Sequence, residues 1–168
     1  MQDRPVDPFA MLRKSHQRLE ERLADLAMAA DEGGDAARQA AIGVLGFIER
    51  SVSRHERDEE DSLFPRLAGA PELVALAERL RSEHREHEAI HADLGRWVET
   101  GEGSLGRIAT RLLEAYRGHA ELEETQLFPA AEGLLDEAAK AAMQAEMDGR
   151  RGRGAGGGGG GGRGGDRG

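Results

Sequence analysis

One stretch of the sequence that could do chemistry occurs twice. Residues 55–65 read HERDEEDSLFP and residues 119–129 read HAELEETQLFP, so both follow the pattern His-x-x-x-Glu-Glu-x-x-Leu-Phe-Pro. A histidine and a glutamate four residues apart share one face of a helix, because an α-helix has about 3.6 residues per turn. Imidazole and carboxylate groups together suit divalent first-row metal ions. Each copy therefore offers a pair of candidate metal ligands, which the fold must bring together.

Two further stretches that contain histidine also resemble each other. Residues 12–26 read LRKSHQRLEERLADL and residues 80–94 read LRSEHREHEAIHADL, and this alignment places His16 on His84. A histidine followed later by a His-x-x-x-Glu stretch thus occurs twice along the chain. The sequence predicts a duplicated helical hairpin, with one histidine on its first helix and the His-x-x-x-Glu stretch on its second.

The apolar residues recur every three or four positions, which predicts an all-α fold. Capping residues, glycines and prolines suggest where each helix begins and ends. The expected helices run from Pro8 to near Glu32, from near Asp35 to Phe64, from Pro71 to Thr100, from near Ser104 to Phe128, and from about Ala131 to Met147. Because the connections are short, the first four are expected to form an antiparallel up-down-up-down four-helix bundle, followed by a short C-terminal fifth helix.

The spacing also predicts which residues of the last two helices face the core. The inward face of the fourth helix is expected to continue from His119 through Glu123 to Gln126. The apolar face of the fifth helix is expected to consist of Leu134, Leu135, Ala138, Ala142 and Met143.

Every histidine of the chain lies on or beside an otherwise apolar helix face. Burying a polar group without a partner costs about 1–3 kcal/mol, so histidines and glutamates belong in a core only if they bind one another or a shared metal ion. Helix bundles build dinuclear metal sites from inward Glu and His side chains of facing helices. The six histidines, together with Glu59 and Glu123, are therefore the residues expected to bind one another or a metal ion.

The third helix carries three histidines that differ in their level along the bundle. Counted from the helix ends at about 1.5 Å per residue, His84 is level with His119, His87 is one turn away, and His91 is roughly 9 Å away. We therefore expect His84 to be a ligand and His87 to be an additional ligand, with a hydrogen-bonded core histidine as the alternative for His87. His91 is expected near the site or in the core.

A family resemblance rests on these histidines and glutamates together. The pattern His16 … His55-x-x-x-Glu59 … His84 … His119-x-x-x-Glu123, with both Leu-Phe-Pro endings, resembles the hemerythrin-like HHE cation-binding domain over about residues 8–147. The resemblance implies a four-helix bundle that holds two non-haem iron ions. It implies that Glu59 and Glu123 bridge the irons and that the four histidines of the pattern are terminal ligands.

The sequence departs from the oxygen-carrying hemerythrins at the second carboxylate. Those proteins place an aspartate five residues after the histidine of the fourth helix, a position that Glu124 occupies here. Glu124 lies about 140° around the helix from His119, whereas Glu123 lies about 40° from it. We therefore expect Glu123 to face inward, and Glu60 and Glu124 to face solvent. Tyr116, one turn before His119, is expected near the centre or in the core.

The number of open coordination positions bears on the function. Two irons with about six positions each need about twelve donors. Two bridging carboxylates, an oxo or hydroxo bridge (an Fe-O(H)-Fe centre) and four or five histidines leave about one or two positions open. An open position suggests that O2, peroxide or NO binds there for sensing, storage or detoxification. The alternative is a di-iron enzyme with catalase-like peroxide turnover, NO handling or iron donation for iron–sulfur repair. A bundle with purely structural histidines is the third interpretation.

The composition excludes several other classes of function. The chain has no cysteine, so it has no disulfide, thiolate metal site or thiol nucleophile, and this suits a cytoplasmic protein. Its polar first residues give no reason to expect a secretory signal, and no apolar run is long enough to predict a membrane-spanning helix. The net charge of −9 argues against nucleic acid and anionic lipid as partners of the bundle. The sequence leaves the oligomeric state open.

The C-terminal segment differs in composition from everything before it. Residues 1–148 are expected to form the bundle domain, and residues 149–168, rich in glycine and arginine, a disordered tail. Such a tail is typically a solubilising extension. Weak contact with RNA or with an acidic protein surface is the alternative.

Overall fold

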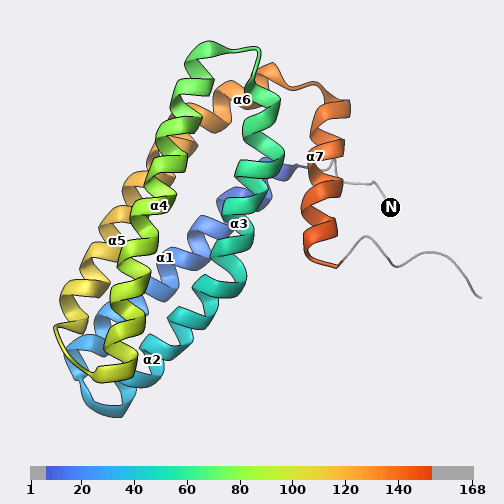
Figure 1. Ribbon diagram of the computed structural model, residues 1–168. Coiled ribbons are helices and arrows are strands. Elements are labelled where there is room, and N and C mark those ends of the chain that lie inside the picture. The colour runs from blue at the N-terminus through green and yellow to red at the C-terminus, as the bar shows by residue number, and fades with distance from the viewer. Residues whose placement is uncertain (1–6, 153–168) are drawn as a thin grey trace, which may run out of the picture.

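The computed structural model of the chain describes residues 7–152, and these residues form a bundle of helices (Figure 1). The α-helices are α1 (Pro8–Glu32), α2 (Gly34–Phe47), α3 (Ser53–Arg57), α4 (Pro71–Thr100), α5 (Leu105–Leu122), α6 (Phe128–Leu134) and α7 (Glu137–Arg150). Shorter helical turns connect some of them. The segments η1 (Ile48–Val52), η2 (Asp58–Leu63) and η4 (Glu123–Leu127) are π-helical, and η3 (Phe64–Leu67) is a 3-10 turn. No β-strand occurs within residues 7–152. The expected all-α helical bundle is confirmed.

The turn between α1 and α2 lies where the glycines predicted it. Gly33 and Gly34 have φ angles of 72° and 62°, in the left-handed region that glycine adopts without a steric penalty. At the other end of α1, the Asp7 carboxylate accepts hydrogen bonds from the backbone N–H groups of Phe9 and Ala10, at 3.0 and 3.1 Å. The start and end of the first helix are therefore fixed by local sequence.

Two stretches of the bundle are continuous rods made of successive helical segments. Each rod changes from α-helical to π-helical hydrogen bonding at its His-x-x-x-Glu-Glu motif. The first runs from Gly34 to Leu67 through α2, η1, α3, η2 and η3, and the second runs from Leu105 to Leu134 through α5, η4 and α6. The second rod contradicts the expectation that the helix ends at Phe128. Pro129 lies in the first turn of α6, at the junction where the pattern changes from π-helical to α-helical. The helix tolerates the missing N–H of proline at that junction and continues to Leu134.

The π-helical turn also changes which residues face the core. Gln126, expected on the inward face, is exposed, and Leu127 is buried in its place. A π-helical turn contains more residues than an α-helical turn, because its hydrogen bonds span five residues instead of four. His119, Glu123, Leu127 and Ala131, which are all buried, therefore follow one another at intervals of four residues.

The last helix, α7, begins six residues later than expected and buries a different set of residues. Asp136 caps it, because its Oδ1 atom accepts a hydrogen bond of 2.8 Å from the N–H of Ala139. With this start, Met143 and Met147 are fully buried. Of the expected apolar face, Leu135 and Met143 are buried, whereas Leu134, Ala138 and Ala142 are exposed.

The C-terminal part of α7 is attached to the π-helical turn η2. Asp58, whose side chain is fully buried, accepts hydrogen bonds from Arg150 at 3.0 Å and from Arg151 at 2.6 Å. Helix α7 thus extends beyond the domain boundary expected at residue 148. Most of the segment expected to be a disordered tail lies outside the described residues.

The core of the bundle consists of two apolar clusters with a polar layer between them. One cluster includes Leu23, Leu94 and Leu112, and the other includes Leu12, Leu80 and Phe128, with the two buried methionines of α7. The buried polar side chains between them are His55, Glu59, His84, His87, His119 and Glu123. None of the helices within residues 7–152 combines the length and the apolar character needed to span a membrane.

Candidate metal centre

The polar layer brings together side chains from four helical rods. They are His16 from α1, His55 and Glu59 from the α3–η2 rod, His84 from α4, and His119 and Glu123 from the α5–η4 rod. The two rods that carry a motif direct both of its residues into the polar layer, because the histidine and the first glutamate share one face. His16 and His84 occupy matching positions in their helices, each four residues after a buried leucine, Leu12 and Leu80.

The donor atoms of these side chains form two groups that share both glutamates. In the first group, the donor atoms of His16, His55, Glu59 and Glu123 all lie within 4.8 Å of one another. In the second group, the same limit holds for Glu59, His84, His119 and Glu123. The arrangement is therefore that of two adjacent sites with two carboxylates in common.

Each shared carboxylate directs one oxygen to each group. Glu59 Oε1 lies 2.7 Å from His55 Nε2, and its Oε2 lies 3.1 Å from His84 Nε2. Glu123 Oε2 lies 2.9 Å from His16 Nε2, and its Oε1 lies 3.1 Å from His119 Nε2. Both glutamates are thus placed so that they could bridge two ions.

These close contacts have the distances of hydrogen bonds but not their directions. Glu59 and Glu123 are fully buried, and none of their carboxylate oxygens has a hydrogen-bond partner among residues 7–152. The Nε2 atoms of His16 and His55 lie 3.1 Å apart, and those of His84 and His119 lie 3.2 Å apart. One Nε2 of each pair can donate to the other, but the carboxylate oxygens that converge on them accept from neither, and this arrangement fits the coordination of a first-row metal ion.

Three further glutamates form hydrogen bonds with Nδ1 of three of the histidines, the ring nitrogen that faces away from the shared glutamates. These three glutamates are called the outer carboxylates. His16 Nδ1 lies 2.8 Å from Glu124, and His84 Nδ1 lies 2.7 Å from Glu60. His119 Nδ1 lies 2.9 Å from Glu83. A ring whose Nδ1–H donates to a carboxylate keeps its Nε2 lone pair free for a metal ion and is held in one orientation.

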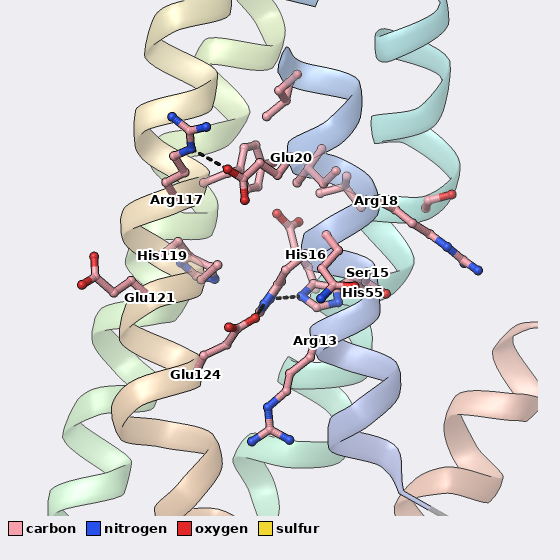
Figure 2. Close-up of a pocket in the computed structure, with 18 of the residues that line it drawn as sticks. Arg13, Ser15, His16, Arg18, Glu20, His55, Arg117, His119, Glu121 and Glu124 are labelled. Carbon is pink, nitrogen blue, oxygen red and sulfur yellow. Dashed lines mark hydrogen bonds and ion pairs between the residues drawn. The ribbon is translucent and has the colours of Figure 1, made fainter. Parts of the chain in front are cut away.

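The expectation that Glu60 and Glu124 face solvent was wrong. Their side chains are 33% and 39% exposed, yet each carboxylate reaches the histidine of a neighbouring helix, as the dashed line from His16 to Glu124 shows in Figure 2. The angle about a residue's own helix shows where the side chain starts, but not which side chain of the next helix it can reach. The repeated Glu-Glu pair was the available signal for both residues. Glu83 was missed because its repeat counterpart is Ser15.

Loss of one outer carboxylate should weaken metal binding without abolishing it. We expect Glu124→Ala to lower the affinity for divalent iron or cobalt roughly 10–100-fold, because His16 loses the group that orients its ring. Competition with a chromophoric chelator measures this change. Glu121→Ala is the matched control, since Glu121 lies on the same rod and points away from the histidines (Figure 2). An equal effect of both substitutions would contradict the role of Glu124.

His87, expected as an additional ligand, joins neither group of donor atoms. Its buried ring packs against Tyr116, with centroids 4.3 Å apart, and against His119, at 5.1 Å. Burial, with the nearby His119, lowers the pKa of His87 to about 3, so this ring is neutral. His91 Nε2 and the Tyr116 hydroxyl share a hydrogen bond of 2.6 Å, as expected for a core histidine.

The charges of the polar layer balance one another when no metal is bound. Burial lowers the pKa of His16 and His84, but nearby carboxylates, chiefly Glu123 and Glu59 respectively, outweigh it and raise both pKa values to about 9. Burial raises the pKa of Glu59, but His55 and His84 outweigh it and hold that pKa well below its usual value. Imidazolium and carboxylate groups therefore stabilise one another in the apo-protein, and a metal ion must displace protons to bind.

A cavity of about 510 Å³ lies beside the polar layer around α1. Its lining includes the ligand candidates His16, His55, His84 and His119, together with the apolar side chains of Leu19, Leu23 and Val52. Figure 2 shows this region, with His16 and His55 at its centre. Glu56 also lines the cavity, and burial raises its pKa to about 7. The cavity offers a path by which a small molecule can reach the centre.

Residues 7–147 match the family model described as the hemerythrin HHE cation binding domain. Neither the curated proteins nor the solved structures provide a significant match to the chain.

Proposed function

The chain belongs to the hemerythrin HHE cation-binding domain family, and from that premise we propose that it is a non-haem di-iron protein. The proposed metal ligands are His16, His55, Glu59, His84, His119 and Glu123. The observation that carries the proposal is the pair of glutamates that both groups share. One ion would use only one pair of histidines and would leave the inward nitrogens of the other pair, with one oxygen of each shared glutamate, without a metal ion. His87, outside both groups, is proposed as a neighbour of the centre.

The proposed ligand set leaves coordination positions for a small molecule. Two octahedral ions need about twelve donors, and four histidines with two bridging carboxylates supply about eight of them. Iron at this centre would supply reversible binding of, or electron transfer to, a small ligand such as O2, NO or peroxide. The cavity beside the centre, with its apolar wall of Leu19, Leu23 and Val52, suits a ligand of that size. We propose ligand sensing, storage or detoxification as the role, and a cytoplasmic location, which the cysteine-free sequence supports.

A di-iron enzyme is the second candidate function, and Glu56 is the observation that favours it. This carboxyl group lines the cavity, and its pKa of about 7 suits a residue that gives or takes protons near neutral pH. Turnover of peroxide needs such a residue, whereas reversible binding of O2 does not. Both candidates use the same metal ligands.

Metal analysis of the iron-loaded protein tests the proposal. We expect two irons per chain and a visible absorption band that changes when O2, NO or peroxide is added. A band that changes without sustained loss of peroxide supports the binding role, and continued peroxide loss supports the enzyme. One iron per chain after loading with excess iron would contradict a di-iron centre.

Metal binding should release protons and strengthen as the pH rises. His16 and His84, whose pKa values are about 9, are protonated in the apo-protein at neutral pH, and each must lose its proton to bind an ion. The apparent affinity is therefore expected to increase from pH 6 to pH 9. Calorimetry in buffers of different ionisation enthalpy measures the released protons. A binding enthalpy that is the same in all buffers would contradict this prediction.

A further inference from the structure

The two halves of the duplicated hairpin support their histidines differently. The alignment of residues 12–26 with residues 80–94 pairs Ser15 with Glu83, directly before His16 and His84. In the second half, Glu83 reaches across to His119 on the next rod, with 2.9 Å between Oε2 and Nδ1. In the first half, the Ser15 hydroxyl instead donates to the backbone oxygen of Met11, at 3.2 Å.

His55 consequently lacks the support that its counterpart His119 has. Its Nδ1 atom is buried and has no hydrogen-bond partner among residues 7–152. The ring itself is 7% exposed, so bulk water does not replace the missing acceptor. His16 retains its contact with Glu124, and His84 retains its contact with Glu60. The group that contains His16 and His55 thus has one outer carboxylate, whereas the group that contains His84 and His119 has two.

The cavity reaches the less supported half, because His16, His55 and Ser15 line it together with His84 and His119. The repeat pairs Glu56 of the first motif with Ala120 of the second, so Ser15 and Ala120 are the small members of their pairs. Both residues line the 510 Å³ cavity, and Figure 2 shows Ser15 in the same region as His16 and His55. A small molecule in the cavity therefore contacts His16 and His55, whose half of the centre lacks one outer carboxylate.

We propose that the two metal positions are unequal, and that the ion held by His16 and His55 is the labile one. This inference rests on the proposed dinuclear centre. An outer carboxylate increases the donor strength of its imidazole and fixes the ring, and removing one typically costs 10–100-fold in metal affinity. The position between His84 and His119 retains its ion, and the position between His16 and His55 exchanges its ion with solution through the cavity. Ser15 sets this difference because, unlike Glu83, it offers no carboxylate to the histidine of the next rod. Ser15 does not itself touch the metal.

Iron release to a chelator tests the inference in the full chain. Protein loaded with two ferrous ions under anaerobic conditions is mixed with excess ferrozine, and absorbance is followed over time. We expect two phases of equal amplitude, the fast phase arising from the labile position. Ser15→Glu should slow the fast phase roughly 10–100-fold and leave the slow phase unchanged. Glu83→Ser should accelerate the slow phase instead, because it removes the outer carboxylate of His119.

Two control variants separate hydrogen bonding from charge. Ser15→Gln places an uncharged acceptor of the same length at this position, and we expect an effect smaller than that of Ser15→Glu. Gln17→Glu adds a negative charge to the exposed surface of α1 beside the same cavity and should leave both phases unchanged. If Gln17→Glu slows release as much as Ser15→Glu does, charge alone explains the effect and the inference is overturned.

The experiment distinguishes failure of this inference from failure of the proposed function. The total iron released reports how many ions the chain holds, and a total below two contradicts the dinuclear centre itself. A total of two, released in a single phase or in phases that Ser15→Glu and Glu83→Ser leave unchanged, overturns only the inequality of the positions. Cobalt titration of the same variants gives the two affinities independently of iron oxidation.

Discussion

Replacing Glu59 with glutamine is expected to remove both metal ions from the chain. Its two carboxylate oxygens lie 2.7 Å from His55 and 3.1 Å from His84, which belong to different groups of donor atoms. An amide keeps the shape of the side chain but offers only one oxygen, and that oxygen is uncharged. Losing an outer carboxylate typically costs 10–100-fold in affinity, and losing a direct ligand of both ions should cost more.

Metal content after loading and gel filtration measures this result. We expect two irons per chain in the parent protein and far less than one in Glu59→Gln. Asp61→Asn is the matched control, because Asp61 lies on the same π-helical turn and is exposed. Glu59→Gln protein that keeps two irons would rule out bridging by Glu59. Circular dichroism of the apo-proteins ensures that a loss of iron does not reflect a loss of folding.

Removing the side chains of Arg150 and Arg151 is expected to lower the free energy of unfolding of the apo-protein strongly. These two guanidinium groups pair with Asp58, whose side chain is fully buried in the turn that also carries Glu59. The double substitution Arg150→Ala and Arg151→Ala leaves this carboxylate buried without a cation. Breaking a buried ion pair from one side costs about 3–5 kcal/mol, so the free energy of unfolding should fall by about that amount.

Urea denaturation of the apo-protein measures the loss, and Asp58→Asn separates its causes. If the buried charge is responsible, Asp58→Asn in the double variant should recover part of the lost free energy, because an unpaired amide is less costly to bury than an unpaired carboxylate. No recovery would mean that the buried charge of Asp58 is not the cause of the lost free energy. The double variant should also bind metal more weakly, because the turn that carries Glu59 loses its attachment to α7.

The sequence was sufficient to predict most of the side chains that face into the polar layer. His55 and Glu59 share a face because they are four residues apart, and the other motif repeats that spacing. The level of His84 followed from counting residues along its helix. These features depend on one helix at a time, so the α-helical period alone determines them.

The features that the sequence did not predict depend on contacts between helices. Glu60 and Glu124 reach histidines on neighbouring rods, and the distance between rods depends on packing along their whole length. The π-helical turn after Glu123 also lacks a clear signal, because Pro129 is as compatible with the end of a helix as with a change of its pattern. The face of α7 was mispredicted because Asp136, and not Ala131, marks its start.

The π-helical turns have a consequence for how this centre could change over evolutionary time. Both glutamates that the two donor groups share lie at or beside the start of such a turn, η2 for Glu59 and η4 for Glu123. A π-helical turn holds more residues than an α-helical turn, so it shifts the direction in which the later side chains point relative to the earlier ones. The α-helical period of the residues before the turn therefore does not fix which residues after it face the core. Insertions or deletions that would misalign a continuous α-helix can be absorbed there. The sequence positions of the polar-layer residues before the turn and of the core residues after it can thus change independently.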